Sequence, residues 1–298
     1  MNGSNQRLDL SSVEETAFLT LYAKAIESQS KDPILKDPIT EAMVERLDPI
    51  LQEQESPMAK KLISRSLDPR ITVHIPLRAK KYDEYATQFM KNFPECVIIN
   101  IGCGLDTRFF RIDNGEIVFF DLDLPDMINL KKQLVIENER YHMIGQSVLD
   151  FGWMDQIAKL NRAAMILAEG VLMYLPKEQV KDLVFELQKR FPNSELVCEL
   201  TNKTWVEGFR GKLAGLKMKQ RFKMKEEAGF KFGVCSADEL ETWGEGIEFL
   251  EKWFYMDDNH PKLGLMRIFR NWKIFNEVQF TAHYRLNAGE KTTETVNN

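Results

Sequence analysis

Residues 96–108 read CVIINIGCGLDTR, and this stretch decides the fold. Its first six residues are almost wholly apolar, as expected of a strand that is buried on both faces of a parallel sheet. The run ends at Gly102 and Gly104, where the missing Cβ atoms permit a tight turn and let backbone N–H groups approach a ligand. The pattern predicts a buried strand, a binding turn and then a helix.

The same strand pattern recurs further along the chain. Short apolar runs stand at residues 117–120, 164–168 and 196–200. Helical patterns stand at residues 125–138, 153–160 and 177–190. This alternation predicts a doubly wound, mostly parallel α/β sheet with its ligand site beyond the carboxyl ends of the strands. After a capped helix at 236–243, we expect residues 247–256 and 278–286 to form a terminal antiparallel pair.

The N-terminal region is predicted to form several short helices over residues 8–70, because prolines interrupt its helical pattern. These prolines are Pro33, Pro38, Pro49, Pro57 and Pro69. A further helix is expected from Leu77 to Asn92. We therefore divide the chain into a helical N-terminal cap with its lead-in helix, residues 1–92, and an α/β domain, residues 93–298, packed as one unit.

A basic insert interrupts the alternation of strand and helix after residue 200. Between residues 203 and 225, eight lysines and arginines stand against one acid, Glu207. Apolar side chains are interleaved with these cations, namely Phe209, Leu213, Leu216, Met218, Phe222 and Met224. Because this arrangement gives the segment an apolar underside, we expect a helical lid at about residues 201–235. A solvated basic helix is the other interpretation.

The composition excludes several classes of protein. The 298 residues are 44% apolar and 29% charged, as in globular chains, and the net charge of −5 provides no general field that attracts nucleic acid. The four cysteines form no C-x-x-C pair and the four histidines no metal-ligand pattern, so we expect neither disulfides nor a metal. Since no signal segment or long apolar span stands out, we expect a cytoplasmic protein without a membrane partner.

The glycine turn differs from a dinucleotide-binding fingerprint. That fingerprint requires a third glycine at position 107, but Thr107 stands there, and its side chain would occupy the helix face that nears a pyrophosphate. A nicotinamide-dependent oxidoreductase is therefore the alternative function and not the main one. A ligand that joins a nucleoside to a charged amino-acid end suits this turn better.

Acidic side chains follow two neighbouring runs of the predicted sheet. Asp121 and Asp123 end the second run, where an acid can accept both hydroxyls of a ribose, and we expect one of them to do so. Both can instead be acids at the N-terminus of the next helix. Glu169 follows the third run, and an ionised carboxylate there needs a partner, which a cationic ligand would supply.

At these residues the chain resembles a known family. The runs VIINIGCGLDTRFFR, VFFDLDLPDMINLKKQL, SVLDFGW and AEGVLMYLP are similar to motifs of the leucine carboxyl methyltransferase family and its bacterial tetracenomycin-type O-methyltransferase relatives. TAFLTLYAKAIES, DPILKDP and LRAKKYDEY extend the likeness, which covers about residues 14–191. The resemblance implies a class I, Rossmann-like methyltransferase with a seven-stranded sheet. It also implies S-adenosylmethionine as cofactor and a small-molecule acceptor, polyketide-like acceptors included.

The resemblance further implies the cofactor contacts. By it, Arg78 holds the methionine carboxylate, the backbone of the Gly102 to Gly104 turn approaches the ligand, and Glu169 faces the ammonium or sulfonium. It also assigns the ribose hydroxyls to Asp123 and the adenine to Ser147 and Val148. The alternative for Arg78 is a surface cation paired with Asp83 or Glu84.

No catalytic residue is assigned from the sequence. Arg108 and Tyr174 are candidates that orient the acceptor, although Arg108 can instead brace the site and Tyr174 can simply be packed. A carboxylate acceptor is already ionised and needs only an anchor, whereas a phenol must lose a proton. His74 or His142 serves as the base only if folding brings one within reach. A protein that binds the cofactor without catalysis is a further alternative.

Overall fold

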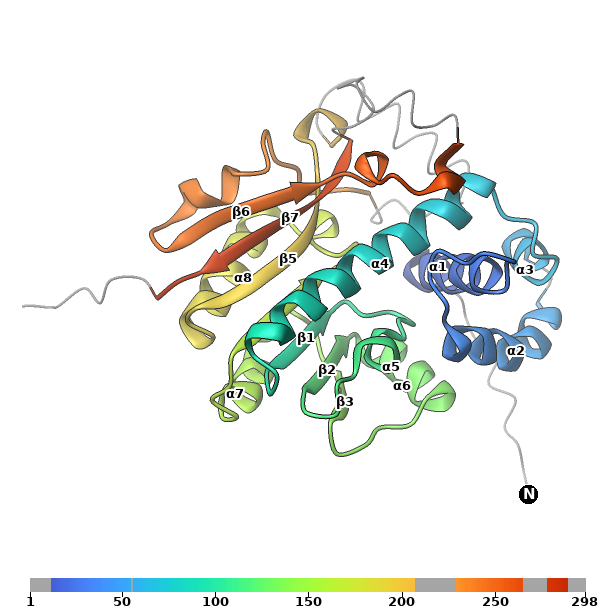
Figure 1. Ribbon diagram of the computed structural model, residues 1–298, viewed down its shortest axis with the longest axis horizontal. Helices are drawn as coiled ribbons and strands as arrows, with labels where there is room; N and C mark the ends of the chain where they lie inside the picture. The colour runs from blue at the N-terminus through green and yellow to red at the C-terminus, as the bar shows by residue number, and fades with distance from the viewer. Residues whose placement is uncertain (1–11, 55, 207–228, 265–277, 289–298) are drawn as a thin grey trace, which may run out of the picture.

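The computed structural model describes residues 12–54, 56–206, 229–264 and 278–288. Its centre is one sheet of seven strands in the order β3-β2-β1-β4-β5-β7-β6 (Figure 1). The strands are β1 Val97–Ile101, β2 Val118–Asp123, β3 Tyr141–Gly145, β4 Ala164–Ala168, β5 Ser194–Thr201, β6 Ile247–Trp253 and β7 Gln279–Leu286. Strands β1 to β5 are parallel, and β7 runs antiparallel to both β5 and β6. The predicted doubly wound, seven-stranded sheet with a terminal antiparallel pair is confirmed.

Helices cover both faces of this sheet (Figure 1). They are α1 Ser12–Ser28, α2 Pro38–Gln52, α3 Pro57–Ile63, α4 Pro69–Asn92, α5 Arg108–Ile112, α6 Pro125–Leu134, α7 Gly152–Ala158 and α8 Lys177–Arg190. Side chains of α1 to α6 share one buried cluster with Ile98, whereas α7 and α8 share the other with Ile99. Because successive side chains of a strand point to opposite faces, β1 is buried on both sides, as its apolar run predicted.

Prolines begin three of the N-terminal helices. Pro38, Pro57 and Pro69 each stand at the first turn, where the missing N–H costs nothing. Asp37 and Ser56 cap two of these helices by accepting hydrogen bonds from Thr40 N and Ala59 N respectively. The predicted series of short helices over residues 8–70 is confirmed for α1, α2 and α3.

The helix expected from Leu77 is longer than predicted. Asp68 caps it by accepting from Arg70 N, so α4 begins at Pro69 and continues through Pro76. The cap and proline signal at residues 68 and 69 outweighs the interior proline. As a result, Arg78 lies in the middle of a 24-residue helix and not in its first turn.

Two other local predictions differ from the structure. The helix expected at 236–243 is a 3-10 helix, η4 Glu239–Trp243. Strand β3 had no apolar run to mark it, because only Tyr141 and Met143 of this edge strand are buried. The central part of the predicted lid, residues 207–228, lies outside the described residues. Within the part of the lid that precedes this gap, the structure describes one short 3-10 helix, η2 Lys203–Trp205.

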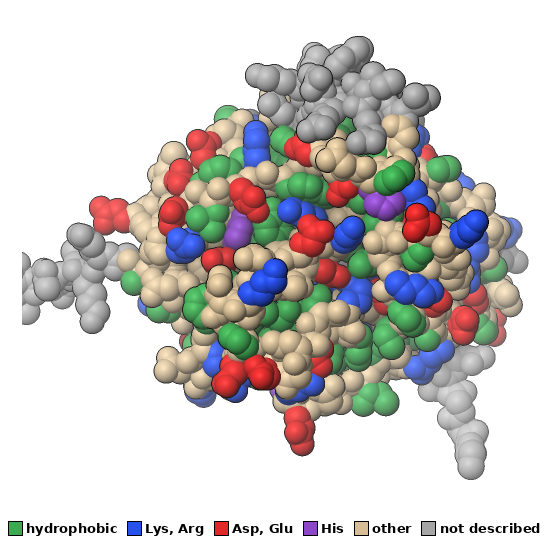
Figure 2. Space-filling view, viewed as in Figure 1, with side chains coloured by type: hydrophobic (Ala, Val, Ile, Leu, Met, Phe, Trp, Pro, Cys, Tyr) green, Lys and Arg blue, Asp and Glu red, His purple; other side chains and the backbone are tan. Residues whose placement is uncertain are grey.

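Positive and negative side chains are mixed on the face of the molecule that carries α4. Figure 2 shows Lys and Arg side chains interspersed with Asp and Glu over the face that carries α4. Among the described residues, no helix is both long enough and apolar enough to cross a bilayer.

A buried ion pair joins β2 to α6. Lys131 is wholly buried, and its Nζ lies 2.7 Å from Oδ2 of Asp121. Asp121 also accepts hydrogen bonds from Tyr141 Oη at 2.6 Å and from Asn100 Nδ2 at 2.9 Å. Burial alone would lower the pKa of Lys131, but the Asp121 carboxylate outweighs it and holds that pKa above its ordinary value. The group therefore ties together β1, β2, β3 and α6.

We expect Lys131→Met to lower the free energy of unfolding by about 3–5 kcal/mol, because it leaves the Asp121 carboxylate buried without a counter-charge. Urea denaturation measures the loss. Lys132→Met is the matched control, since that exposed neighbour pairs with Glu137 at the surface and should cost less than about 1 kcal/mol. Equal losses in the two variants would show that the buried pair contributes no more than a surface pair.

Candidate cofactor site at the strand ends

Three neighbouring strands place predicted site residues together at their carboxyl ends. β2, β1 and β4 are parallel neighbours, and Asp123, Gly102 and Glu169 stand at or just after their carboxyl ends. Hydrogen bonds join two of these ends, because Cys103 N donates to Leu122 O at 3.1 Å and Gly104 N donates to Asp123 Oδ2 at 2.7 Å. The sheet topology thus brings together residues that are 67 positions apart in the sequence.

The glycine turn needs both of its glycines. Gly102 has φ +61° and Gly104 has φ +50°, which is the left-handed region that residues with a Cβ rarely adopt. A Cβ on Gly102 would also lie 2.2 Å from Cγ2 of Val171, in the loop that follows β4. Close approach between two strand-end loops therefore requires glycine here.

The Thr107 side chain was expected on the helix face that nears a pyrophosphate, but it packs against the N-terminal helices instead. The side chain is buried, and its hydroxyl contacts Asp37 Oδ2 at 2.5 Å and Thr40 Oγ1 at 2.8 Å. Thr107 therefore ties the turn to the N-terminal cap, because both partners belong to the start of α2.

The two acids that end β2 differ sharply. Asp121 is buried in the ion pair with Lys131, and its carboxylate is held by three donors, so it is not available to a ribose. Asp123 is half-buried, and it accepts hydrogen bonds from Gly104 N and Leu124 N. Burial raises the pKa of Asp123, although the two backbone donors oppose the shift. Of this pair, only Asp123 remains a candidate ribose ligand.

Glu169 has partners within the chain, and they are arginines. Arg78 Nε lies 2.8 Å from Oε1 of Glu169, and Arg108 Nη2 lies 2.7 Å from its Oε2. Burial alone would raise the pKa of Glu169, but the two guanidiniums outweigh it and hold that pKa below its usual value. The partner that we expected a cationic ligand to supply is thus already provided by two arginines of the chain.

Arg78 also bonds to an acid that the sequence analysis did not single out. Its Nη1 lies 2.6 Å from Oε1 and 2.8 Å from Oε2 of Glu199, at the end of β5. Burial raises the pKa of Glu199, with Arg78 opposing the shift. Arg78 is therefore a clamp between two strand ends and not the surface cation paired with Asp83 or Glu84 that was considered as an alternative.

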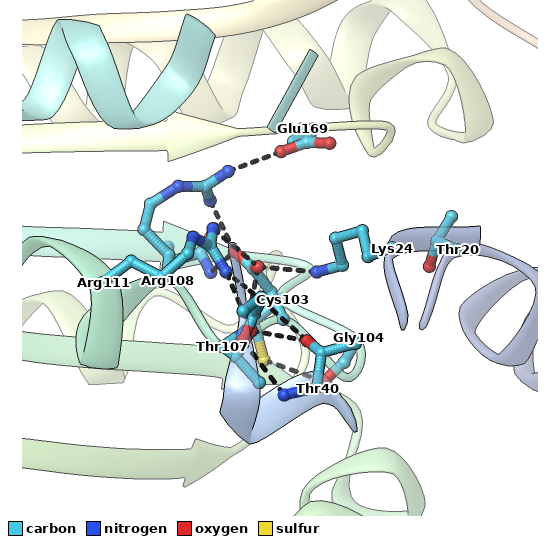
Figure 3. A network of polar contacts seen from close by, with 12 residues as sticks. Thr20, Lys24, Thr40, Cys103, Gly104, Thr107, Arg108, Arg111 and Glu169 are labelled. Atoms are coloured by element: carbon cyan, nitrogen blue, oxygen red, sulfur yellow. Dashed lines mark hydrogen bonds and ion pairs between the residues drawn. The ribbon is translucent and has the colours of Figure 1, made fainter. Parts of the chain in front are cut away.

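Arg108 connects three carboxylates. Its Nε and Nη1 lie 2.7 Å from Asp83 and 2.6 Å from Asp106. Its Nη2 lies 2.7 Å from Glu169, and Figure 3 shows this contact. Only 1% of its side chain is exposed, so it braces the site and does not offer a surface to an acceptor. The candidate role of Arg108 in orienting the acceptor is therefore not supported.

The N-terminal cap contributes to the same network. Lys24 of α1 lies 2.9 Å from Asp106, and Arg111 contacts Asp37 and Asp83 at 2.7 Å each. Figure 3 shows Lys24 and Arg111 on opposite sides of the glycine turn. No role was predicted for Lys24, Asp37 or Arg111. All three nevertheless stand in the motifs quoted for the resemblance, since Lys24 lies in TAFLTLYAKAIES, Asp37 in DPILKDP and Arg111 in VIINIGCGLDTRFFR.

The remaining predicted residues lie on the loops that follow β3 and β4. Ser147 and Val148 come just after β3, and this loop reaches the site because Gln146 N donates to Asp123 O at 2.9 Å. Tyr174 closes the 3-10 helix η1 Leu172–Tyr174 and makes an edge contact with Phe230 at 5.6 Å between ring centroids. Burial raises the pKa of the Tyr174 hydroxyl, and nearby Glu199 adds to the shift.

The family model for leucine carboxyl methyltransferase matches residues 17–188 of this chain. The chain belongs to this family. The resemblance found in the sequence is thereby confirmed, and with it the class of S-adenosylmethionine-dependent methyltransferase. A nicotinamide-dependent oxidoreductase receives no support.

Individual relatives agree with the family. The chain is 29% identical to the tetracenomycin polyketide synthesis O-methyltransferase TcmP of Streptomyces glaucescens, over 90% of this chain and 91% of the relative. It is 28% identical to leucine carboxyl methyltransferase 1 of Debaryomyces hansenii, but over only 37% of this chain and 41% of that relative. A DUF574 family protein from Streptomyces avermitilis shares the fold, with a TM-score of 0.55, 14% identity and coverage of 91% of this chain and 96% of that one.

We expect Gly102→Ala to lower the free energy of unfolding by more than the roughly 1–3 kcal/mol of backbone strain alone, because the new methyl group also meets Val171. Gly115→Ala separates the two effects, since Gly115 has φ +87° but nothing within 4 Å of its Cβ position. Urea denaturation of both variants makes the comparison. If the losses match, the contact between the loops after β1 and β4 is not a constraint.

Proposed function

We propose that this methyltransferase transfers the methyl group of S-adenosylmethionine to an oxygen of a small-molecule acceptor, either a hydroxyl or a carboxylate. The observation that carries the proposal is the meeting of Gly102, Asp123 and Glu169 at three adjacent strand ends. Ligands of doubly wound sheets bind beyond these ends. The name of the Streptomyces glaucescens relative supports an O-methyltransferase and a polyketide-like acceptor.

Each end of the cofactor finds a complementary group. The amino-acid end of S-adenosylmethionine carries one carboxylate and one ammonium, which suit Arg78 and Glu169 respectively. These two side chains pair with each other here, so binding would exchange one ion pair for two. Asp123 accepts the ribose hydroxyls, because a carboxylate that already accepts two backbone N–H groups has further lone pairs.

The other predicted contacts complete the cofactor site. Gly102 and Gly104 let the backbone approach the ligand, since no Cβ stands on that side of the turn. Ser147 and Val148 flank the adenine, the first through hydrogen bonds and the second through apolar packing. Tyr174 lies on the loop after Glu169 and orients the acceptor.

The charges around the site favour the methyl donor over its product. Within the described residues, the network contains five carboxylates and four cations. S-adenosylmethionine has a net charge of +1 because of its sulfonium, whereas the product S-adenosylhomocysteine is neutral overall. A partly buried site with one excess negative charge therefore attracts the donor more strongly and lets the product leave.

The chemical step is an in-line displacement. The acceptor oxygen attacks the methyl carbon, the carbon–sulfur bond breaks, and its electron pair neutralises the sulfonium. Positive charge disappears from sulfur, so the protein mainly has to align the three atoms and exclude water. Two arginines serve this alignment: Arg108 holds Glu169 while it also bonds to Asp83 and Asp106. Arg78 is held in addition by Glu199.

We expect Asp123→Asn and Glu169→Gln each to weaken binding of S-adenosylhomocysteine by about 1–3 kcal/mol, because each removes a charge-assisted hydrogen bond. Isothermal titration calorimetry measures the affinity. Asp113→Asn is the control, since Asp113 pairs with Arg140 at the surface away from the strand ends. Affinities equal to that of the wild type in both site variants would contradict the site.

Turnover decides whether the protein is an enzyme or only a binder. Labelled S-adenosylmethionine is incubated with a panel of phenols and carboxylic acids, and methyl transfer to oxygen supports the proposal. Binding of the cofactor without transfer to any acceptor in the panel would favour the non-catalytic alternative.

A further inference from the structure

One buried acid at the strand ends has no role in the cofactor contacts proposed above. Glu199 stands near the end of β5, and only 2% of it is exposed. An ionised carboxylate in such a place costs free energy unless it is paired, and burial raises the pKa of Glu199. The proposed contacts use Arg78, Asp123 and Glu169 but not this acid. The site therefore contains a buried titratable group that those contacts do not explain.

Both carboxylate oxygens of Glu199 face one nitrogen of Arg78. Nη1 of Arg78 lies 2.6 Å from Oε1 and 2.8 Å from Oε2. The backbone N–H of Gly170, in the loop after β4, also donates to the carboxylate of Glu199. Because a strand carries Glu199 and a backbone N–H bonds to it, its carboxylate can fix the direction in which the planar guanidinium points.

The three nitrogens of the Arg78 guanidinium have different surroundings. Nε bonds to Glu169 Oε1 at 2.8 Å and Nη1 bonds to Glu199, but Nη2 makes no hydrogen bond to another described residue. Nη2 is also not among the buried polar atoms that lack a partner, so within the described part of the chain it keeps access to solvent. A guanidinium nitrogen of this kind offers two N–H donors to a ligand.

A glycine stands beside this open nitrogen. A Cβ atom on Gly170 would lie 3.9 Å from Nη2 of Arg78 and 3.5 Å from Oε2 of Glu199. Gly170 also has φ +71°, a backbone conformation that residues with a side chain rarely adopt. The loop after β4 therefore brings only backbone to Nη2 at this position, and space for a ligand group is left there.

A competing arrangement would use up this nitrogen. An arginine and a carboxylate frequently pair through two parallel hydrogen bonds, which for Arg78 and Glu169 would engage both Nε and Nη2. In the structure Glu169 accepts from Nε alone, since its other oxygen, Oε2, bonds to Arg108 Nη2 at 2.7 Å. Glu199 holds Nη1 at the same time. The two-bond pair with Glu169 therefore does not form, and Nη2 stays available.

We propose that Glu199 is a positioning residue, which holds the guanidinium of Arg78 so that Nη2 can bind the carboxylate of S-adenosylmethionine. The inference rests on the proposed function and adds a residue that acts in the same site through Arg78. When the ammonium of the cofactor pairs with Glu169, Arg78 loses one of its two carboxylate partners. Glu199 is then the partner that keeps the arginine at the strand ends.

Two ligands separate the two ends of the cofactor. S-adenosylhomocysteine carries the amino-acid end, whereas 5′-methylthioadenosine has the same nucleoside and sulfur without it. Isothermal titration calorimetry measures the affinity of both ligands for the wild type, Glu199→Gln and Glu199→Asp. Glu195→Gln is the matched control, because Glu195 lies on the same face of β5 but near the amino end of the strand, where it pairs with His283.

In Glu199→Gln we expect the affinity for S-adenosylhomocysteine to fall about 10- to 100-fold, because a neutral amide no longer holds Nη1 of Arg78 and Nη2 is free to pair with Glu169. The affinity for 5′-methylthioadenosine should stay unchanged, since that ligand has no carboxylate. Glu199→Asp keeps the charge on a side chain that is one methylene shorter, so we expect a smaller loss, again confined to S-adenosylhomocysteine. Glu195→Gln should leave both affinities unchanged.

Several results would overturn the inference. Equal losses for the two ligands in Glu199→Gln would mean that Glu199 supports the fold and not the position of Arg78. Unchanged or higher affinity for S-adenosylhomocysteine in that variant, or full affinity in Glu199→Asp, would show that Glu199 only balances charge. A wild type that binds both ligands equally well would show that Arg78 does not contact the carboxylate. A wild type that binds neither would instead contradict the proposed cofactor site, and the inference with it.

Discussion

The site depends on one buried guanidinium. Arg108 bonds to Asp83 of α4, Asp106 of the glycine turn and Glu169 after β4, and these three carboxylates come from segments far apart in the sequence. A buried arginine is tolerable only when its planar fork is fully paired, so it fixes the distance between a helix, a turn and a strand end. Arg78 repeats the arrangement one strand further along, between Glu169 and Glu199. Together the two arginines keep Glu169 ionised and in place.

This arrangement holds the strand ends together through ion pairs within the chain. The charges that brace the site are satisfied by one another, so they can hold the strand ends without a ligand doing so. Asp123 lies outside these ion pairs and accepts two backbone N–H groups, so its carboxylate has lone pairs left for a small molecule. The same principle distinguishes the two neighbouring aspartates of β2, since only Asp121 is committed to a buried lysine.

Much of the fold could be predicted from the sequence, because strands buried on both faces require almost wholly apolar runs such as residues 97–101. The edge strand β3 was not predicted from an apolar run, because it needs apolar side chains on one face only. Gly102 and Gly104 indicated the turn, since glycine readily adopts the positive φ angles that its backbone requires. The roles of Lys131 and Glu199 could not be predicted, because a charged residue in a helix or strand normally indicates a solvated face, and only tertiary pairing shows otherwise. Whether Asp121 or Asp123 faced the ligand was likewise decided by packing.

The connection between the cap and the glycine turn has a consequence for how such proteins evolve. Lys24 and Asp37 provide counter-charges to Asp106 and Arg111, so each ion pair has one member in the cap and the other next to β1. A cap transferred from a relative would leave Asp106 and Arg111 without these partners unless it carried a lysine and an aspartate at the matching positions. Exchange of the cap between relatives is thus constrained, because the charges of the cap and of the glycine turn must match in these two ion pairs.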